Sequence, residues 1–351
     1  MRCRILTSPP DLGVETAWRA FLKTIKLPAH YVTPDFFSEP WSVGDRPFAV
    51  IAEEEDVVLG VLTGVRRRCE VLSGMPHRAQ IALTPGPCRA AVEECLVNGL
   101  IALSNGHGVI RLYATEVLER TVARGFSAEK VDDTIVVDLQ RSEPELFKSF
   151  AGRKQRDLRH AERSGLEIVE TDDPDDLAAL MPAVEETFRR HGLPVPSLDE
   201  IAALMKLKRN RRLFVAKANG RVIAGTVVRF EPGGLAEYSM NVSLRESRRE
   251  FRPNDALLWA ALRWSRAQGC PVFDMAGNSL FKSGFSRQVH IPLPPVPATR
   301  SVQVWPRRNT RGISVSSTVG LRQRSGAEST SSKSAGRTAF DARDVRPIPH
   351  G

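Results

Sequence analysis

The sequence predicts an α/β protein built from two copies of one domain, because one pattern of strands and helices occurs in it twice. Residues 47–65 and 212–230 align over their whole length with a constant shift of 165. Each segment consists of two β-rich runs around a polar break, which is typical of a β-hairpin. A helix and a short apolar strand follow each hairpin in the same order. This repeated order indicates a duplicated α/β domain.

The two hairpins differ in their turns. Residues 53–56, Glu-Glu-Glu-Asp, interrupt the first, whereas Asn219 and Gly220 interrupt the second and suit a type I′ turn. Gly60 and Gly225 lie inside the second strand of each hairpin, where glycine predicts a bulge or a close approach of another element. The alignment places Gly60 on Gly225, and five further pairs match: Phe48 on Leu213, Val50 on Val215, Val57 on Val222, Val58 on Ile223, and Leu62 on Val227.

A proline about 27 residues beyond each hairpin glycine marks the first turn of a helix. These prolines are Pro87 and Pro253. Apolar residues then recur with helical spacing, as Val92, Cys95 and Leu96 in the first copy and as Leu257, Ala260, Ala261 and Trp264 in the second. Short strands at 109–114 and 271–276 follow.

Between the copies, residues 134–139 predict a strand, and a helix is expected from Ser142, its N-cap, to about Ser164, before Gly165. Four basic residues of this helix form one stripe, and Leu158 and Ala161 lie to its side: Arg153, Arg156, His160 and Arg163. Such a stripe is either a solvated face or a clamp for phosphate groups of a substrate.

The net charge of +9 is concentrated at the end of the chain, where residues 301–351 carry nine Lys or Arg against three acids. This Ser/Arg-rich segment lacks apolar periodicity, and we expect a disordered basic tail. The rest of the chain carries about +3, so the charge is weak evidence for a nucleic-acid partner. The expected division is a first domain at 1–140, a basic linker helix at 141–166, a second, catalytic domain at 167–300 and the tail at 301–351.

Several classes of protein are disfavoured by what the sequence lacks. It has no apolar run long enough to span a membrane and no secretory signal, and its five cysteines show no metal or redox spacing. The seven histidines show no metal-ligand spacing, and neither a Gly-x-Ser-x-Gly elbow nor a Walker loop is present. We therefore expect a cytoplasmic protein without a metal, either a monomer or a dimer.

Two segments resemble the Fem-type acyltransferases. One is the strand ending in Val-Asp-Leu at 137–139, followed by a helix of the form Arg-Lys-x-Arg-x-x-Arg-x-Ala-Glu-x-x-Gly at 153–165. The other runs from Arg252 to Ser286 and ends in Phe-Lys-Ser-Gly-Phe-Ser. The resemblance covers roughly residues 15–290 and is more specific in the second half.

The resemblance implies two tandem GNAT (Gcn-type N-acetyltransferase) domains, each a mixed, mostly antiparallel sheet flanked by helices. The group includes peptidoglycan cross-bridge aminoacyl ligases and acetyltransferases of cellulose or exopolysaccharide biosynthesis. The implied activity is transfer of an acyl or aminoacyl group to an amine or hydroxyl of a cell-envelope or exopolysaccharide precursor, which is a small-molecule, lipid-linked or nucleotide-linked acceptor. Acyl-CoA, such as acetyl-CoA, is the preferred donor, and aminoacyl-tRNA is the second donor.

The resemblance also places Lys282, the Lys of a Phe-Lys motif, at the acyl-transfer centre, as the cation that stabilises the oxyanion. Phe281 and Phe285 are expected to anchor the helical segment while Lys282 turns toward a cleft. Asp274, at the end of a buried strand, either orients Lys282 or accepts a proton, and the alternative is that it caps the loop amides of Ala276 and Gly277.

Residues 235–243 are expected to form the strand beside this centre. Glu237 and Tyr238 point to opposite faces of it, and the matching position in the family favours Tyr238, with Glu237 as the alternative base. Arg252 and Asn254 open the following helix and are candidates to bind a phosphate or carboxylate, while Asp255 is expected to cap it.

Residues 245–258, where a GNAT enzyme would bind the CoA pyrophosphate, contain no glycine, which argues against the usual CoA site in the second copy. Arg153 and Arg156 are the remaining candidates to hold substrate phosphates. A hypothesis from another class is a catalytically inactive tandem module that binds an anionic polymer or a nucleotide-linked ligand through its basic helix and tail.

Overall fold

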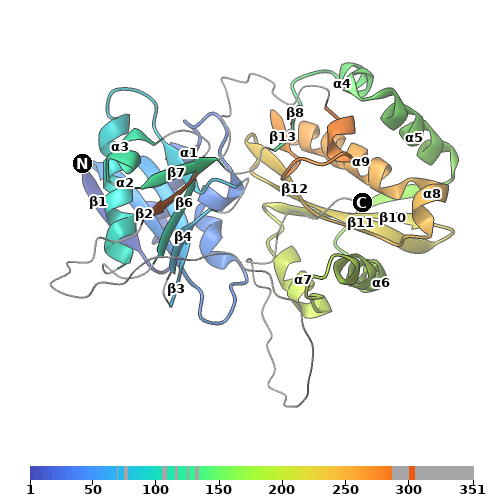
Figure 1. Ribbon diagram of the computed structural model, residues 1–351, viewed down its shortest axis with the longest axis horizontal. Helices are drawn as coiled ribbons and strands as arrows, with labels where there is room; N and C mark the ends of the chain where they lie inside the picture. Colours follow the sequence, from blue (N-terminus) through green and yellow to red (C-terminus); the bar gives the residue numbers. More distant parts are fainter. Residues whose placement is uncertain are drawn as a thin grey trace, which may run out of the picture.

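The chain forms two α/β halves that lie side by side, each with one sheet and helices packed on it (Figure 1). The structure is a computed structural model that describes residues 1–68, 70–74, 78–104, 109–114, 118–124, 126–130, 134–286 and 300–304. Within these residues, no helix combines the length and the apolar character that crossing a bilayer requires.

The first half contains an eight-stranded sheet in the order β1-β2-β3-β4-β6-β14-β7, with β5 beside β3. Its described strands are β1 (Arg2–Leu6), β2 (Arg46–Glu54), β3 (Val57–Arg67), β4 (Glu70–Ser73), β5 (Ile81–Leu83), β6 (Val109–Ala114), β7 (Ser127–Lys130) and β14 (Arg300–Val304). Its described helices are α1 (Leu12–Leu22), η1 (His30–Val32), η2 (Pro34–Ser38), α2 (Arg89–Leu103) and α3 (Glu119–Ala123). Helix α2 and helix α1 bury separate apolar clusters with the sheet.

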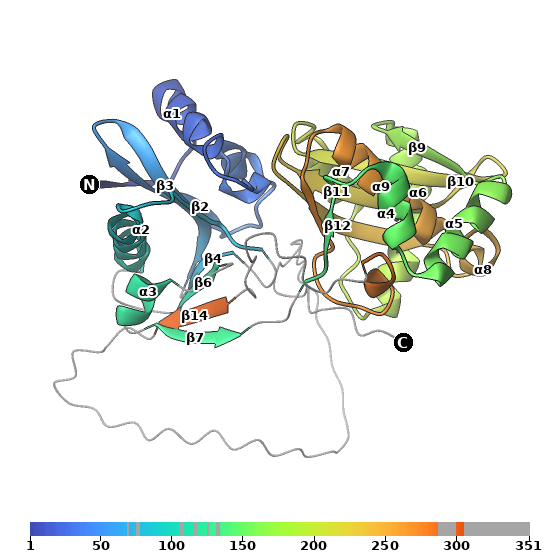
Figure 2. The same ribbon diagram turned by 90° about the horizontal axis from the view of Figure 1, so that it is seen from above.

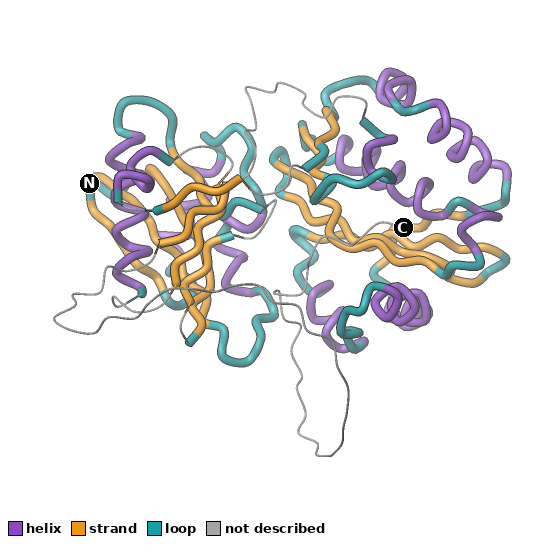
Figure 3. Tube along the Cα trace, in the orientation of Figure 1, coloured by secondary structure: helices purple, strands orange, loops and turns teal. Residues whose placement is uncertain are grey.

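The second half contains a six-stranded sheet in the order β8-β13-β12-β11-β10-β9. Its described strands are β8 (Val136–Asp138), β9 (Glu167–Thr171), β10 (Arg211–Ala218), β11 (Arg221–Phe230), β12 (Leu235–Ser243) and β13 (Val272–Asp274). Its described helices are α4 (Glu143–Ser149), α5 (Gly152–Arg163), α6 (Pro174–Arg190), α7 (Leu198–Met205), α8 (Ser247–Phe251), α9 (Pro253–Ala267) and η3 (Lys282–Gly284). Helices α4, α5 and α9 lie on one side of the sheet, and α6 and α7 lie on the other (Figure 3).

The duplication predicted from the sequence is confirmed by the two sheets. Each is mostly antiparallel and contains one parallel pair, which is β4 with β6 in the first half and β12 with β13 in the second. Both central hairpins also turn in the same way, because Glu55 and Asp56 have positive φ angles like those of Asn219 and Gly220. A type I′ turn requires positive φ at both central residues. This conformation costs free energy in the first hairpin, where neither central residue is glycine.

The shift of 165 between the copies is wrong by one residue. Ala52 lies opposite Gly60 in the first hairpin, and Ala216 lies opposite Ala224 in the second, so equivalent residues are 164 apart. Each ladder also contains one irregularity directly beside these pairs. The hairpin glycines Gly60 and Gly225 are therefore not equivalent.

Because the sequence alignment is wrong by one residue, it pairs side chains that lie on opposite faces of their sheets. Phe48 packs with the α2 layer, whereas Leu213, its partner in the sequence alignment, packs with the α6 layer on the opposite face of its sheet. A one-residue shift has this effect because strand side chains alternate. Both hairpins are buried on both faces, so their apolar pattern does not fix the register.

Close approach explains both glycines. A Cβ on Gly60 would lie 2.3 Å from Cγ1 of Val92 in α2, and one on Gly225 would lie 2.6 Å from Cδ2 of Leu180 in α6. The sequence prediction of a close approach is thus correct, although helices of different layers make it.

For two strands, the sheet in which they lie differs from the one that the expected domain limits predict. Strand β8 pairs with β13 of the second sheet, although residues up to 140 were expected to belong to the first domain. Strand β14 pairs with β6 and β7 of the first sheet, although the disordered tail was expected to start at 301 (Figure 2). Short strands take their sheet from long-range pairing, which local sequence does not encode. Residues 305–351, the rest of the expected tail, lie outside the described residues.

The linker helix expected from Ser142 to Ser164 is divided into α4 and α5. Ser142 begins α4 with a capping box, as predicted. Phe150, whose ψ of 152° is extended, ends α4 and is fully buried. The break also frees the N–H of Ala151, which donates to the carbonyl of Gly284 at 2.8 Å.

Polar and charged groups join the two halves. The N–H of Leu235 donates to the carbonyl of Pro28 at 2.9 Å. Arg211 in β10 forms a buried ion pair with Glu39 at 2.5 Å, and Arg78 pairs with Glu237 in β12 at 2.7 Å.

Candidate active site

The candidate site is built where β12 and β13 stop pairing. Their parallel ladder ends at Glu237 and Asp274, which lie opposite each other, while β12 continues to Ser243. On its other side β12 carries an irregularity that leaves Ser239 without a partner in the ladder with β11. Diverging parallel strands are a common place for a ligand in α/β folds, and a bulge re-aims the groups beside it.

Asp274 is held by two groups at the end of β13. The N–H of Ala276 donates to Oδ1 at 2.7 Å, and the hydroxyl of Thr134 donates to the same oxygen. Thr134 in turn accepts from the N–H of Gly277 at 2.9 Å. Asp274 therefore caps the amide of Ala276, as the loop-capping alternative predicts, whereas the amide of Gly277 bonds to Thr134. Burial, reinforced by the carboxylate of Glu237, raises the pKa of Asp274 to about 6.

Lys282 begins the short helix η3 and directs its ammonium inward. Its Nζ donates to the carbonyl of Ala276 at 2.9 Å and lies 6.0 Å from the ring centre of Tyr238. Burial lowers the pKa of Lys282 to about 8; Arg78 adds to the effect and Asp274 opposes it. Lys282 and Asp274 are thus close enough to influence each other.

The backbone that connects Asp274 to Lys282 is unusual at Ala276, where φ is +53° without a glycine. This conformation places the carbonyl of Ala276 at the lysine ammonium and its N–H at the carboxylate. Left-handed non-glycine residues cost free energy and often occur at functional sites.

Glu237 faces the first half of the molecule rather than the interior of the second. Besides its 2.7 Å pair with Arg78, it lies 4.0 Å from Arg229, the residue opposite it on β11. The Nε of Arg229 is buried without a hydrogen-bond partner. The Glu237 carboxylate therefore links the candidate site to the junction of the halves.

Tyr238, the next residue on β12, turns to the opposite face, as the alternation predicts. It lies within the apolar cluster under α9, with its ring centre 6.5 Å from that of Phe273. Burial raises the pKa of its phenol well above the ordinary value. At neutral pH it can therefore act only as a neutral hydroxyl.

The start of α9 is more closed than expected. Arg252 is in the left-handed conformation, with φ of +53°, and pairs with Asp157 of α5 at 3.4 Å. The amide oxygen of Asn254 is buried without a hydrogen-bond partner. Asp255 does not cap the helix as expected, because its Oδ1 binds the ammonium of Lys154 at 2.5 Å.

Arg153 and Arg156 lie on the outer face of α5. Both are exposed, and Arg153 lies 3.8 Å from Asp157 one turn along the same helix. His160 and Arg163 are also exposed, while Leu158 and Ala161 are buried beneath the helix, as predicted. The stripe is thus exposed, and Nε2 of His160 also lies 2.6 Å from the carbonyl oxygen of Glu250.

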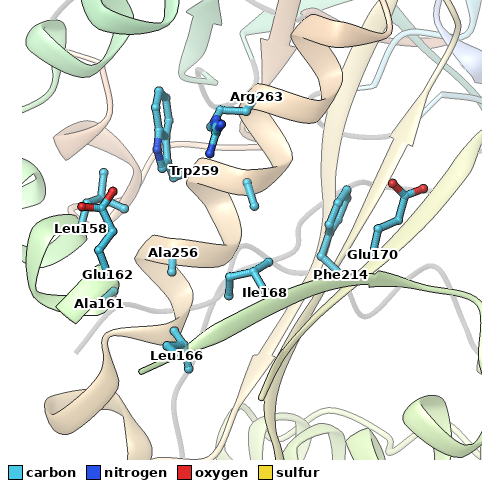
Figure 4. A pocket seen from close by; sticks show the side chains of 11 residues that line it. Leu158, Ala161, Glu162, Leu166, Ile168, Glu170, Phe214, Ala256, Trp259 and Arg263 are labelled. Atoms are coloured by element: carbon cyan, nitrogen blue, oxygen red, sulfur yellow. The ribbon is translucent and has the colours of Figure 1, made fainter. Parts of the chain in front are cut away.

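A separate groove of about 350 Å³ lies between α5, α9 and the strands β9 and β10 (Figure 4). Leu158 and Ala161 line it from α5, Trp259 from α9, and Ile168 and Phe214 from the strands. None of the residues that line this groove is one of the predicted catalytic residues.

The structure brings together Lys282, Asp274 and Glu237, and it places Tyr238 beside them on the inner face. Sequence reasoning missed Thr134 and Arg78, which lie 140 and 159 residues from their carboxylate partners and carry no local signal. It also missed Lys154, although this residue is the Lys of the Arg-Lys motif that carried the resemblance. No three His, Cys, Asp or Glu side chains of the described part converge as metal ligands would.

Residues 148–283 match the family profile described as an acetyltransferase (GNAT) domain. No curated protein matches the sequence.

Three solved structures show the extent of the similarity in fold. FemX has a TM-score of 0.66 at 12% identity, over 86% of this chain and 97% of that one. The L-PGS structure from Bacillus licheniformis has a TM-score of 0.54 at 13% identity, over 86% and 94%. A tandem GNAT protein from the clavulanic acid biosynthesis pathway has a TM-score of 0.51 at 14% identity, over 86% and 97%.

The similarities extend over both halves, and the profile covers α5, the second sheet from β9 to β13 and Lys282. Residues 148–283 therefore match a GNAT domain, and the whole chain shares the fold of FemX and of the tandem GNAT protein.

Proposed function

We propose that this protein transfers an acyl or aminoacyl group to an amine or hydroxyl acceptor, with the reaction centred on Lys282. The observation that carries the proposal is a partly buried ammonium held beside two carboxylates, Asp274 and Glu237, at the point where β12 and β13 diverge. Such a group can stabilise the negative charge that develops on the carbonyl oxygen during acyl transfer.

The pKa values support complementary roles for the two central residues. With a pKa of about 6, Asp274 is mostly ionised at neutral pH and accepts the proton of the attacking amine or hydroxyl. With a pKa of about 8, Lys282 is mostly protonated and donates hydrogen bonds to the oxyanion. When the intermediate collapses, the bond from the carbonyl carbon to the donor breaks, and Lys282 is placed to protonate the leaving atom.

Glu237 and Tyr238 complete the proposed site in different ways. Glu237 helps keep the pKa of Asp274 near neutrality, because two neighbouring carboxylates resist ionising together. Tyr238, a neutral phenol below the Lys282 ammonium, contributes an aromatic surface and a hydroxyl. Phe281 fixes the turn that carries Lys282.

Acyl-CoA, such as acetyl-CoA, is the first donor to test because residues 148–283 match a GNAT acetyltransferase domain. The start of α9 is an objection to the usual pyrophosphate site. Pro253 has no N–H, and the N–H of Asp255 already bonds to the carbonyl of Arg252 at 3.2 Å. Few helix amides are thus free to bind phosphate. Aminoacyl-tRNA is the second donor, a proposal that rests on the resemblance to the group that includes the peptidoglycan cross-bridge aminoacyl ligases.

We propose a cytoplasmic reaction on a lipid-linked or nucleotide-linked precursor of the cell envelope or of an exopolysaccharide. Arg252, Asn254, Arg153 and Arg156 are the side chains proposed to contact its phosphates or those of the donor. The proposal rests on the resemblance to Fem-type proteins and on the basic outer face of α5.

The test compares the wild type with Lys282→Met. The control is Lys206→Met, which removes an exposed lysine distant from Lys282 in the sequence. Binding of acetyl-CoA is measured by calorimetry, and acyl transfer from acetyl-CoA or from lysyl-tRNA to a UDP-linked amino sugar is followed by mass spectrometry. We expect Lys282→Met to lower kcat/KM at least about 100-fold, a typical loss for one oxyanion donor, and Lys206→Met to have no effect.

A folded Lys282→Met protein with wild-type activity would remove Lys282 from the mechanism. Steeply salt-dependent binding of a polyanion, together with no donor binding and no transfer, would instead favour an inactive binding module.

A further inference from the structure

The turn that carries Lys282 rests on a buried ion pair contributed by two other elements. Lys154 of α5 donates from Nζ to Oδ1 of Asp255 in α9 at 2.5 Å, and both side chains are about nine-tenths buried. The same ammonium lies 3.9 Å from the ring centre of Phe281 and 5.0 Å from that of Phe285. The two rings that flank the turn therefore share one cation.

The backbone of the turn is pressed against the same lysine. A Cβ on Gly284 would lie 2.8 Å from both Cγ and Cε of Lys154. One residue before α5, the N–H of Ala151 donates to the carbonyl of Gly284 at 2.8 Å. Phe150 adds an edge-to-face contact with Phe285, with their ring centres 5.1 Å apart. Thus residues 150–154 hold the turn through one backbone hydrogen bond, one aromatic ring and one cation.

The other hydrogen bonds of the turn hold its backbone and the tip of the Lys282 side chain. They run from Ser283 N–H to Ser279 at 2.8 Å, from Phe285 N–H to Lys282 at 3.0 Å and from the Ser283 hydroxyl to Leu280 at 3.1 Å, with a longer contact from Lys282 N–H to the Ser279 hydroxyl. The Lys282 ammonium donates to the carbonyl of Ala276 at 2.9 Å. Since Phe281 immediately precedes Lys282, a movement of its ring would displace the Lys282 ammonium from Ala276.

We propose that Lys154 is a positioning residue, whose ammonium is held by Asp255 and fixes Phe281 so that Lys282 points at the reacting carbonyl. This inference rests on the proposed function of Lys282. A buried ion pair is seldom the most stable way to fill an interior, and its advantage is geometric specification, because a cation and two rings admit fewer arrangements than an apolar contact.

Five further charged groups surround the two lysines, and the test leaves all of them unchanged. Asp157 and Arg252 lie near the Lys154–Asp255 pair. Asp274, Glu237 and Arg78 face Lys282. None of these five residues is changed in the variants, so any change at Lys282 reports on the turn.

The principal variant is Lys154→Met combined with Asp255→Asn, which removes both charges and keeps an unbranched chain against Gly284. The readout is the rate at which Lys282 reacts with trinitrobenzenesulfonate as a function of pH, mapped by mass spectrometry. In the wild type, the reaction rate of Lys282 is expected to reach half its maximum near pH 8, because burial lowers the pKa of its ammonium. In the variant, the turn loosens and water reaches Lys282, so the midpoint rises by at least one unit toward 10.5, the ordinary value for lysine.

The kinetic expectation is a loss of about 10-fold or more in kcat with little change in KM, since a displaced oxyanion donor acts on the transition state. Lys154→Arg keeps a cation that can pair with Asp255 and stack on Phe281, and it is expected to recover part of the activity. Thermal unfolding establishes that each variant is folded. Lys206→Met serves as the lysine control.

A folded double variant with the wild-type reactivity profile and wild-type kcat would overturn the proposal. If the double variant does not fold, Phe281→Leu decides, because it removes the ring and leaves the ion pair in place: a raised Lys282 midpoint supports the proposal and an unchanged one overturns it. Failure of the proposed function is a separate result, namely full activity of Lys282→Met, and the reactivity of Lys282 tests positioning without reference to activity.

Discussion

Asp274 is the residue at which stability and the proposed chemistry conflict most clearly. Its folded-state pKa, about 6, lies above the ordinary value of 3.8, chiefly because of burial. The folded protein therefore holds this proton more tightly than the unfolded chain does. The resulting stabilisation is fully present below about pH 4 and is lost as pH rises through about 6.

Asp274→Asn should consequently stabilise the protein at pH 8 relative to wild type, because the amide has no charge to bury. The upper limit of the gain is about 3 kcal/mol, reduced by weaker hydrogen bonds to Ala276 and Thr134. Urea denaturation at pH 4 and pH 8 measures it, with the exposed Asp199→Asn as control. An equal loss of stability at both pH values would show that the hydrogen bonds outweigh the charge. Activity should fall sharply at every pH.

At the scale of elements, the segment between the two halves places several residues against the turn that carries Lys282. Division of the expected linker helix into α4 and α5 allows Phe150, Ala151 and Lys154 to meet η3 within five residues of chain. An unbroken helix would instead commit the N–H of Ala151 to the carbonyl of Phe147, four residues earlier. The break thus couples α5 to the turn that bears Lys282.

Gly284→Ala tests this packing directly. Its Cβ would meet Lys154 at 2.8 Å, and Lys154 is held by Asp255, so the contact is not easily relieved. We expect destabilisation of about 1–3 kcal/mol, typical of overpacking, with reduced activity. Gly152→Ala is the matched control, because its nearest neighbour would be 3.7 Å away. Similar thermal midpoints for Gly284→Ala and Gly152→Ala would contradict the expected overpacking against Lys154.

At the scale of the whole molecule, two buried ion pairs join the halves. Arg211 and Glu39 are both more than nine-tenths buried, and Arg78 and Glu237 are nearly as enclosed. The second pair includes a residue of the candidate site. The relative placement of the halves and the charge at the site therefore depend on each other.

Arg211→Met should cost about 3–5 kcal/mol, because it leaves the Glu39 carboxylate buried without its partner. Combining it with Glu39→Gln removes that charge and should recover most of the stability. Urea unfolding, followed at several wavelengths, measures both effects and reveals any separation of the two halves into distinct transitions. Equal stability of the single and double variants would argue that the pair is not coupled.

Local patterns were sufficient to predict much of this protein. The hairpin turn at Asn219, the helix after Pro253 and the opposite faces of Glu237 and Tyr238 all follow from backbone preferences and alternation. Placing Asp274 near Lys282 required only that a strand end and the following turn lie close in sequence.

Features that depend on distant pairing could not be predicted. The alignment of the two hairpins was wrong by one residue because both faces of each strand are buried, so neither face stands out in the sequence. Strand β8 is three residues long and takes its sheet from β13. Lys154 appeared to be one more cation in a basic helix, since Asp255 lies 101 residues away.

The position of β14 has a consequence for synthesis on the ribosome. The first sheet receives this strand between β6 and β7 only after residues 300–304 have been made, when the whole second half has already emerged. Until then β6 and β7 each lack a neighbour, and unpaired strand edges invite association with other chains. The order of translation therefore favours completion of the Lys282-bearing half before the half that contains the N-terminus, and a chain interrupted shortly after Ser286 would leave the earlier sheet open.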